Sequence, residues 1–237
     1  MKALLLSAGF GTRLKPVTYL IPKCLVPVHG KPLMEYWLDI LCRAQIVPVL
    51  INLHYLSDQV ENFIKKSQYK KYIKTVYETK LLGTGGTLLK NRIFFGREQI
   101  LLIHGDNLSN FDINAFINTH NLRPDKCDIT MMTFKSETPE SCGIVELDSD
   151  NIVCAFHEKV CNPPGNLANG AVYILEPSIF DFLSSLGKDE IDFSTEVLPH
   201  YLGRIYTFHN TCYHRDIGTM ENYRRAETEF SNVEHFF

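Results

Sequence analysis

The sequence predicts an α/β protein, a three-layer α/β/α sandwich around a mixed, mainly parallel sheet. Short apolar runs alternate with longer amphipathic stretches through the first half of the chain, as strands joined by helices do. Strand, helix and strand in succession imply parallel strands with right-handed crossovers, covered by helices. The 237 residues suit a single domain over 1–237, with a small flap around 136–168 as the one elaboration.

The first half of the chain contains the clearest strands and helices. Continuous apolar runs bounded by turn residues predict buried strands over residues 3–7, 47–53, 73–77 and 99–104. Helical spacing predicts helices over residues 33–44 and 57–66, with Ser57 as the N-cap of the second helix. This alternation is the observation on which the fold class depends.

The second half is richer in strands. We expect strands over residues 128–135, 143–147, 151–157 and 170–175, with a tight connection at residues 148–151. Helices are expected over residues 177–186, 193–201 and 220–230. The proline- and glycine-containing segment 160–166 cannot be regular structure, and we expect a loop there beside the flap.

Composition excludes several classes of protein. The chain is 45% hydrophobic and 22% charged, as in ordinary globular proteins that bury a core. A net charge of −3 does not favour binding to nucleic acid or to an acidic membrane. No apolar run reaches the roughly 18 residues that a membrane span needs, and the apolar N-terminal run is too short for a signal peptide.

The cysteines favour a reducing compartment. There are seven, an odd number, and they are scattered without a C-x-x-C pair, which argues against structural zinc. We therefore expect free thiols and a cytoplasmic location.

A glycine-rich turn follows the first predicted strand, with the sequence SAGFGTRL at residues 7–14. Gly9 and Gly11 permit close approach of the backbone to a ligand, so their N–H groups can point at phosphate oxygens. The turn is neither a dinucleotide fingerprint, because Leu14 replaces the third glycine, nor a P-loop, because G-K-[ST] is absent.

Two cations distinguish this turn from a purely structural one. Arg13 lies within it, and Lys23 follows in a segment stiffened by Pro22 and Pro27. Fixed cations beside a glycine-rich turn suit a triphosphate, whose α-phosphoryl group gains charge during displacement. The alternative is a surface arginine and lysine that flank a structural turn.

Residues 9–27 resemble the signature of the sugar-phosphate nucleotidyltransferases, G-x-G-T-R-L followed by P-K-x-x-x-P. This family includes mannose-1-phosphate and heptose-1-phosphate guanylyltransferases, and the resemblance extends from residue 3 to about residue 225. It implies the Rossmann-like nucleotidyltransferase fold, with Arg13 and Lys23 as catalytic residues. The implied nucleotide-binding residues in this region are Leu6, Ala8, Gly9, Gly11 and Thr12.

Two aspartates are candidates for a magnesium site. Asp106 follows the strand predicted at residues 99–104, at the end where α/β sheets bind ligands, and Asp216 lies in YHRDIGT at residues 213–219. Carboxylate oxygens suit Mg²⁺, and the resemblance implies that this pair binds the metal. The alternative is a turn-capping aspartate at each position. His104, His157 and His214 lack metal-ligand spacing and are expected to pack or to form hydrogen bonds.

The resemblance also implies a sugar-phosphate site. The sequence FHEK at residues 156–159 is similar to the family's E-K motif, and Asn169 and Gly170 to its N-x-G motif. Glu158 and Asn169 would contact sugar hydroxyls, and Lys159 the sugar phosphate; a surface Glu–Lys pair is the alternative. Asn107, Gly170 and Glu196 complete the implied set.

A second glycine-rich segment, LLGTGGT at residues 81–87, resembles the family's L-G-T-[AG]-G loop. That loop lies against the nucleotide base, which implies base contacts from Gly83, Thr84 and Gly85. The alternative is a glycine-rich helix start with no ligand.

Together these motifs predict transfer of a nucleoside monophosphate, from GTP by preference, to a sugar 1-phosphate with release of pyrophosphate. An anionic oxygen of the sugar 1-phosphate attacks the α-phosphorus of the triphosphate in line with the leaving pyrophosphate, so no general base is needed. The alternatives are a uridylyltransferase acting on an amino-sugar or muramic acid 1-phosphate, or a catalytically silent nucleotide-sugar-binding relative. A glycosyltransferase would carry D-x-D where this chain has Asp106-Asn107-Leu108, and an oxidoreductase would carry an acid where it has His54-Tyr55.

The expected partners are a nucleoside triphosphate, a sugar 1-phosphate and the cofactor Mg²⁺, with neither nucleic acid nor membrane. The expected role is in nucleotide-sugar and polysaccharide biosynthesis. The sequence leaves open which sugar is used and whether the chain forms a homodimer.

Overall fold

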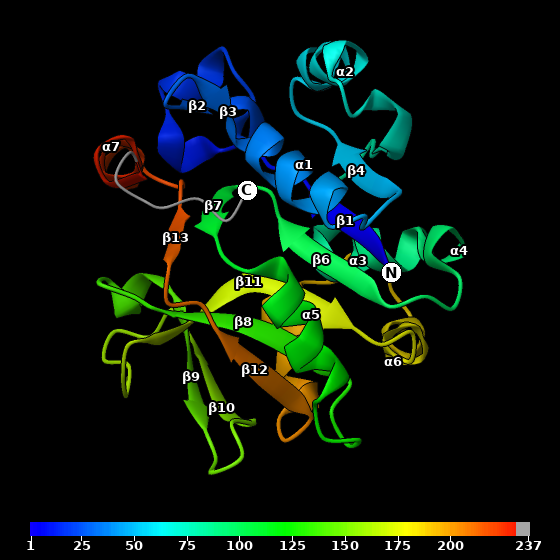
Figure 1. The fold of residues 1–237 in the computed structure, drawn as a ribbon, viewed down its shortest axis with the longest axis vertical. Coiled ribbons are helices and arrows are strands. Elements are labelled where there is room, and N and C mark those ends of the chain that lie inside the picture. Colours follow the sequence, from blue (N-terminus) through cyan, green and yellow to red (C-terminus); the bar gives the residue numbers. More distant parts are fainter. Residues whose placement is uncertain (231–237) are drawn as a thin grey trace. The chain divides into compact units, whose positions relative to one another are not determined.

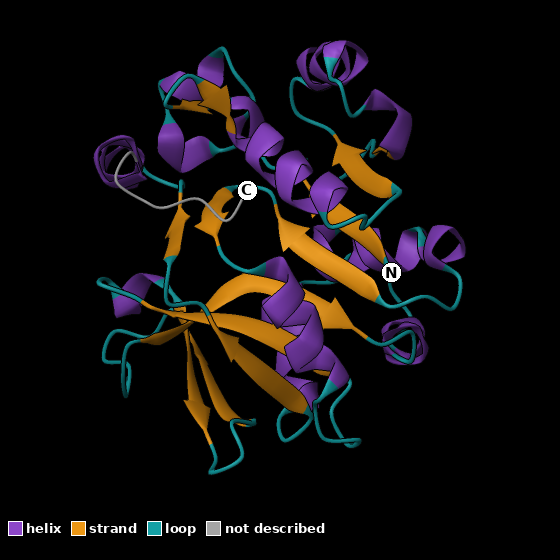
Figure 2. Cartoon of the chain, viewed as in Figure 1, coloured by secondary structure: helices purple, strands orange, loops and turns teal. Residues whose placement is uncertain are grey.

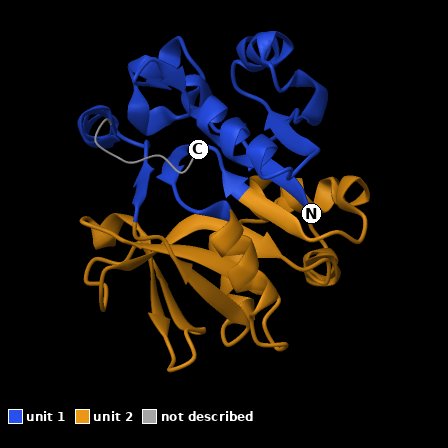
Figure 3. Ribbon diagram, in the orientation of Figure 1, with its two compact units in different colours: residues 1–81, 103–113, 212–237 blue, residues 82–102, 114–211 orange. Residues whose placement is uncertain are grey.

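The structure is a computed structural model that describes residues 1–230. The chain divides into two compact units (Figure 3). Unit 1 comprises Met1–Leu81, Ile103–Ile113 and Cys212–Phe237, and unit 2 comprises Leu82–Leu102 and Asn114–Thr211. The single domain with a flap at residues 136–168 stays a prediction, and its residues 231–237 lie outside the described part of the chain.

Unit 1 is built on parallel strands (Figure 1). β1 (Lys2–Leu6) pairs with β4 (Val49–Leu53), and β4 with β5 (Ile73–Tyr77), both in parallel, and the residues of β6 (Ile100–His104) are divided between the two units. The crossovers contain α1 (Leu33–Arg43) and α2 (Ser57–Lys66). All five residues of β4 are buried, which explains why its sequence is apolar except for Asn52. The predicted α/β class is therefore confirmed here.

Short elements that the sequence did not predict complete unit 1. β2 (Pro27–Val28) pairs with β3 (Lys31–Pro32), and β7 (Asn107–Asn110) pairs with β13 (Tyr213–Asp216), both antiparallel. α7 (Met220–Glu229) follows β13, close to its predicted bounds. Strands of two to four residues are too short to show alternation, so only the pairing identifies them.

Unit 2 is mainly antiparallel (Figure 2). Its sheet contains β8 (Ile129–Lys135), β9 (Gly143–Leu147), β10 (Val153–Glu158) and β11 (Leu167–Leu175) in antiparallel pairs, and β12 (Ile205–His209) parallel to β8. The sheet is therefore mixed, as predicted, although β12 was not foreseen. The helices of this part are α3 (Gly83–Lys90), α4 (Arg92–Phe95), α5 (Ile113–Asn121) and α6 (Ile179–Ser185).

Three local predictions were wrong. Ser57 is the first residue of α2 rather than its N-cap, because Leu56 precedes it in a left-handed conformation. Residues 193–201 form a π-helical turn, η6 (Phe193–Val197), and a 3₁₀ turn, η7 (Leu198–Tyr201), since Pro199 lacks the N–H that a regular helix needs. β11 begins at Leu167 rather than at residue 170.

Across residues 1–230, none of the helices combines the length and apolar character that a membrane crossing requires.

A buried histidine in unit 2 makes stability depend on pH. The ring nitrogens of His120 lie 2.7 Å from Oγ1 of Thr130 and 3.2 Å from Oε1 of Glu176, and the side chain is fully buried. Burial, with the nearby Arg123 charge, lowers the pKa of His120 to about 4 despite Glu176. The folded protein therefore resists a proton that the unfolded chain accepts near pH 6.5.

We expect the contribution of His120 to stability to be complete above pH 6.5 and to fall as the pH drops towards 4. The slope for one such group is at most about 1.4 kcal/mol per pH unit. Urea unfolding at pH 7 and pH 5 should show a smaller loss of stability for His120→Asn than for the unsubstituted protein. An equal loss in both proteins would contradict this assignment.

Candidate functional site

The glycine-rich turn is held against Lys23 by close packing. Gly11 has φ +63°, and its carbonyl oxygen accepts a hydrogen bond from Oγ1 of Thr18 at 2.8 Å. A Cβ at Gly11 would lie 2.8 Å from Cγ2 of Thr18 and 3.2 Å from Cβ of Lys23. Both the backbone conformation and the available space therefore require glycine here.

Lys23 begins a short 3₁₀ turn, η3 (Lys23–Leu25), immediately after Pro22. Only 9% of its side chain is exposed. Its ammonium group donates to Oδ2 of Asp106 at 2.6 Å and to Oδ1 of Asp216 at 3.1 Å. Residues far apart in the sequence, which were predicted as a catalytic lysine and two metal ligands, thus meet at one point within unit 1.

Strand pairing explains why the two aspartates are neighbours. In the antiparallel pair β7–β13, Asp216 lies opposite Asn107, the residue after Asp106. The N–H of Ile217 donates to the carbonyl of Asp106 at 3.0 Å. Trp37 on α1 donates its indole N–H to the carbonyl of Asn107 at 2.8 Å, which fixes β7 to the helix.

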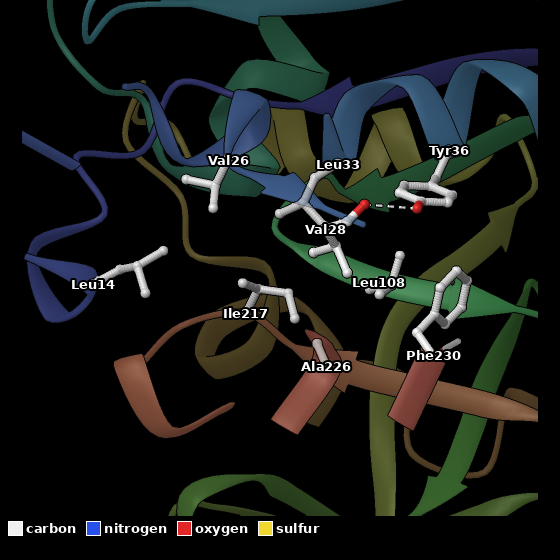
Figure 4. Packing of buried hydrophobic residues seen from close by; sticks show 9 residues of the cluster. All are labelled: Leu14, Val26, Val28, Leu33, Tyr36, Leu108, Ile217, Ala226 and Phe230. Carbon is white, nitrogen blue, oxygen red and sulfur yellow. Dashed lines mark hydrogen bonds between the residues drawn. The ribbon is translucent and has the colours of Figure 1, made fainter. Parts of the chain in front are cut away.

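An apolar cluster anchors the segments that carry the candidate site (Figure 4). The four charged residues of the candidate site each lie within three sequence positions of a buried member of this cluster. They are Arg13, Lys23, Asp106 and Asp216. Leu14 follows Arg13, and Ile217 follows Asp216. The cluster consists of Leu14, Val26, Val28, Leu33, Tyr36, Leu108, Ile217, Ala226 and Phe230. The same burial that stabilises unit 1 therefore fixes the backbone at the charged residues.

The charges of Lys23, Asp106 and Asp216 stabilise one another. Burial raises the pKa of the Asp106 carboxyl, but the Lys23 ammonium more than offsets this and lowers that pKa to about 2. Burial likewise lowers the pKa of Lys23, and Asp106 and Asp216 reverse the effect, so the net shift is upward. Arg13 lies 3.6 Å from Oδ2 of Asp216, with 61% of its side chain exposed.

The seven cysteines are free thiols. Burial raises the pKa of Cys24, next to Lys23, to about 12, so this thiol stays protonated and is a poor nucleophile.

The two carboxylates fit a magnesium ion in their chemistry. Asp106 and Asp216 already share one cation, the Lys23 ammonium, and their hard oxygens suit Mg²⁺, which takes one or two carboxylates and completes its shell with phosphate and water. Within residues 1–230, no three His, Cys, Asp or Glu side chains gather as a metal site. His214 instead bonds to Ser109 at 2.6 Å, and His157 to Glu146 at 2.7 Å.

Gly218 leaves the space that the Asp216 carboxylate and Arg13 occupy. A Cβ there would lie 2.5 Å from Oδ2 of Asp216 and 3.0 Å from a guanidinium nitrogen of Arg13. We expect Gly218→Ala to displace the Asp216 carboxylate and, in the pyrophosphate-releasing reaction that the sequence predicts, to lower kcat/KM about 10²-fold. Gly165→Ala is the matched control, because a Cβ there meets nothing within 4 Å. Equal activity of the two variants would exclude the steric argument.

In unit 2, two of the predicted sugar-side residues form an ion pair with each other, and a third bonds to a neighbouring tyrosine. Glu158 ends β10, and its carboxylate lies 2.8 Å from the ammonium of Lys159. Asn169 lies inside β11 at a break in strand register, where its amide donates to the hydroxyl of Tyr173 at 2.7 Å. The ion pair agrees equally with a ligand site and with a surface pair, so the roles of these residues stay predictions.

The second glycine-rich segment forms the start of α3 rather than a loop. The N–H of Gly85 donates to the carbonyl of Ile191 at 2.9 Å, and Oγ1 of Thr84 accepts from the N–H of Phe193 at 2.9 Å. The carboxylate of Glu196 pairs with Lys188 and accepts a hydrogen bond from the N–H of Asp192. Packing against the backbone around Ile191 therefore explains why glycines are present here. Contact between this segment and a nucleotide base stays a prediction.

Sequence reasoning missed a buried polar pair that supports the glycine-rich turn. Oδ1 of Asn52 accepts from the N–H of Ser7 at 2.8 Å, and its amide donates to Glu78 at 3.1 Å. Only 3% of Asn52 and 5% of Glu78 is exposed. A polar residue inside the apolar strand VLINL was the available signal, because buried polar groups need specific partners.

The sequence matches the profile of the nucleotidyl transferase family over residues 2–232. The chain belongs to that family. It is 30% identical, over 96% of its length, to a mannose-1-phosphate guanylyltransferase of Mycobacterium tuberculosis. It is 31% identical, over 98% of its length, to a D-glycero-alpha-D-manno-heptose 1-phosphate guanylyltransferase of Aneurinibacillus thermoaerophilus. A UTP–glucose-1-phosphate uridylyltransferase of Synechocystis is 28% identical over 95% of the chain.

The lengths of these family members differ. The chain covers 64% of the Mycobacterium protein and 62% of the Synechocystis protein, but 99% of the heptose 1-phosphate guanylyltransferase. A solved structure from Bacillus anthracis, described as a glucose-1-phosphate thymidylyltransferase, superposes with a TM-score of 0.88 at 21% identity, over 100% of this chain and 98% of its own. This likeness confirms the predicted nucleotidyltransferase fold.

Proposed function

We propose that the chain transfers a nucleoside monophosphate from GTP to a sugar 1-phosphate and releases pyrophosphate. The observation that carries this proposal is the meeting of Lys23, Asp106 and Asp216 beside the glycine-rich turn, with Arg13 at Asp216. Displacement at a triphosphate needs fixed cations on the phosphates and carboxylates for a metal, and this cluster supplies both.

The attacking oxygen belongs to the sugar 1-phosphate and is already an anion, so no general base is needed. The chain has to align this oxygen with the α-phosphorus of the triphosphate and to neutralise the negative charge of both substrates. Arg13 would hold the β- and γ-phosphates and Lys23 the α-phosphoryl group, with backbone N–H groups of residues 9–12 on the phosphate oxygens. A Mg²⁺ ion on Asp106 and Asp216 would screen the repulsion between the two anions. Lys159 would contact the phosphate of the incoming sugar.

The choice of GTP rests on the two guanylyltransferase relatives, one of which the chain matches over 99% of that relative's length. The uridylyltransferase relative makes UTP the second candidate. The remaining nucleotide contacts would come from Leu6, Ala8, Gly83, Thr84 and Gly85, and the sugar-phosphate contacts from Asn107, Glu158, Asn169, Gly170 and Glu196. The cytoplasmic location and the homodimer stay predictions.

One assay tests the proposal. The protein is incubated with Mg²⁺, each nucleoside triphosphate in turn, and a panel of hexose, amino-sugar and heptose 1-phosphates, and pyrophosphate is recorded. We expect release with GTP and a mannose- or heptose-type 1-phosphate, and none without Mg²⁺. Release with UTP alone would replace the guanylyl assignment by the uridylyl one, and no release with any pair would indicate a silent relative.

A further inference from the structure

The Lys23 ammonium lies between the two aspartates that are the candidates for a metal site. Its Nζ lies 2.6 Å from Oδ2 of Asp106 and 3.1 Å from Oδ1 of Asp216. A lysine with 9% of its side chain exposed is stable only when paired with anions, and here it has two. A second cation on the same two carboxylates would lie a few ångströms from the ammonium and be repelled by it.

Backbone packing on both sides holds the Lys23 ammonium against these two carboxylates. Gly11 packs against Cβ of Lys23, and the 3₁₀ turn after Pro22 directs the side chain from a buried segment. On the other side, the pairing of β7 with β13 keeps the two aspartates together. Two of the three ammonium donors are used, so one is left for an incoming phosphate oxygen.

We propose that Lys23 is a resident counter-ion that withholds Asp106 and Asp216 from free divalent metal, so that the carboxylates accept metal only together with a triphosphate. This inference rests on the metal role that the proposed function gives to the aspartates. The triphosphate offers the ammonium a new set of anionic oxygens and thereby releases the carboxylates. After the exchange the ammonium contacts phosphate oxygens and the metal contacts the carboxylates, so each anionic group keeps a cationic partner.

Binding of Mn²⁺ without nucleotide tests the exchange, with the electron paramagnetic resonance signal of free Mn²⁺ as the readout. Mn²⁺ prefers the same oxygen ligands as Mg²⁺. We expect Lys23→Met to bind Mn²⁺ at least about tenfold more tightly than the unsubstituted protein, because one positive charge has left the site. Lys23→Arg keeps the charge and should bind as weakly as the unsubstituted protein.

Two controls assign the gain to this site. Lys15 is exposed, and its ammonium lies over the Tyr19 ring at 4.8 Å, two residues along the chain from Arg13. Lys15→Met removes this charge and should leave the Mn²⁺ affinity unchanged. Adding Asp106→Asn to Lys23→Met should abolish the gain. Circular dichroism verifies folding, and Mn²⁺ should raise the melting temperature of Lys23→Met more than that of the unsubstituted protein.

Equal Mn²⁺ affinity of the unsubstituted protein and Lys23→Met would overturn the inference. If Lys23→Met does not fold, tight nucleotide-free binding of Mn²⁺ by the unsubstituted protein would overturn it as well. The outcome is separable from that of the proposed function. Pyrophosphate release with equal affinities rejects the exchange alone, whereas a gain in affinity without pyrophosphate release from any substrate pair rejects the proposed reaction and leaves the withholding of metal in place.

Discussion

Lys23→Met is expected to lower turnover about 10²- to 10³-fold, the range for loss of one fixed group that stabilises charge in a transition state. Methionine keeps most of the aliphatic length that packs beside Gly11, so the change removes the charge more than the packing. Asp106 and Asp216 then lose their shared counter-ion, but their side chains are 40% and 42% exposed and can be hydrated. The protein should therefore remain folded.

The measurement is kcat for pyrophosphate release with saturating nucleotide and sugar 1-phosphate. Lys15→Met, which removes a neighbouring exposed charge, should retain the original kcat. Near-normal kcat in Lys23→Met would exclude Lys23 from the reaction. A melting temperature far below that of the unsubstituted protein would instead show that the ion pairs serve the fold.

Asp106→Asn is expected to lower kcat/KM roughly 10²- to 10³-fold, which corresponds to several kcal/mol of lost charge stabilisation. Asparagine has the shape of aspartate, so the pairing of β7 and the hydrogen bond from Ile217 to the carbonyl of residue 106 should persist. The carboxylate is lost as an anionic ligand, so the Mg²⁺ concentration for half-maximal rate should also rise.

A titration of rate against Mg²⁺ concentration checks this result, with Asp58→Asn on α2 as the control for loss of an exposed carboxylate in the same unit. Full activity of Asp106→Asn at the original Mg²⁺ concentration would remove Asp106 from the metal site. The two site variants should also differ from each other. Lys23→Met loses turnover but gains metal affinity, whereas Asp106→Asn loses both, and purely structural roles for the two residues would not produce this contrast.

The sequence by itself determined the fold class and most elements of unit 1. β4, α1, α2 and β5 appeared within about two residues of their predicted bounds. Burial of one helix face gives α1 and α2 a period of 3.6, whereas full burial gives β4 a run of mainly apolar residues. The turn at residues 7–14 and the charged residues Arg13, Lys23, Asp106 and Asp216 were also readable, since the residue types that handle phosphate and metal stand in a recognisable order.

Only the tertiary structure decided how these residues meet. No local pattern relates Asp106 to Asp216, which are 110 positions apart; the pairing of β7 with β13 does, and each strand is too short to be seen in the sequence. Likewise, the spacing around Lys23 favoured a phosphate ligand, and the structure showed its ammonium bound to both carboxylates. The glycines at residues 83–86 became the start of α3 because the backbone of Ile191 packs against them. Local periodicity records burial, whereas pairings and charge contacts depend on distant segments that the folded chain brings together.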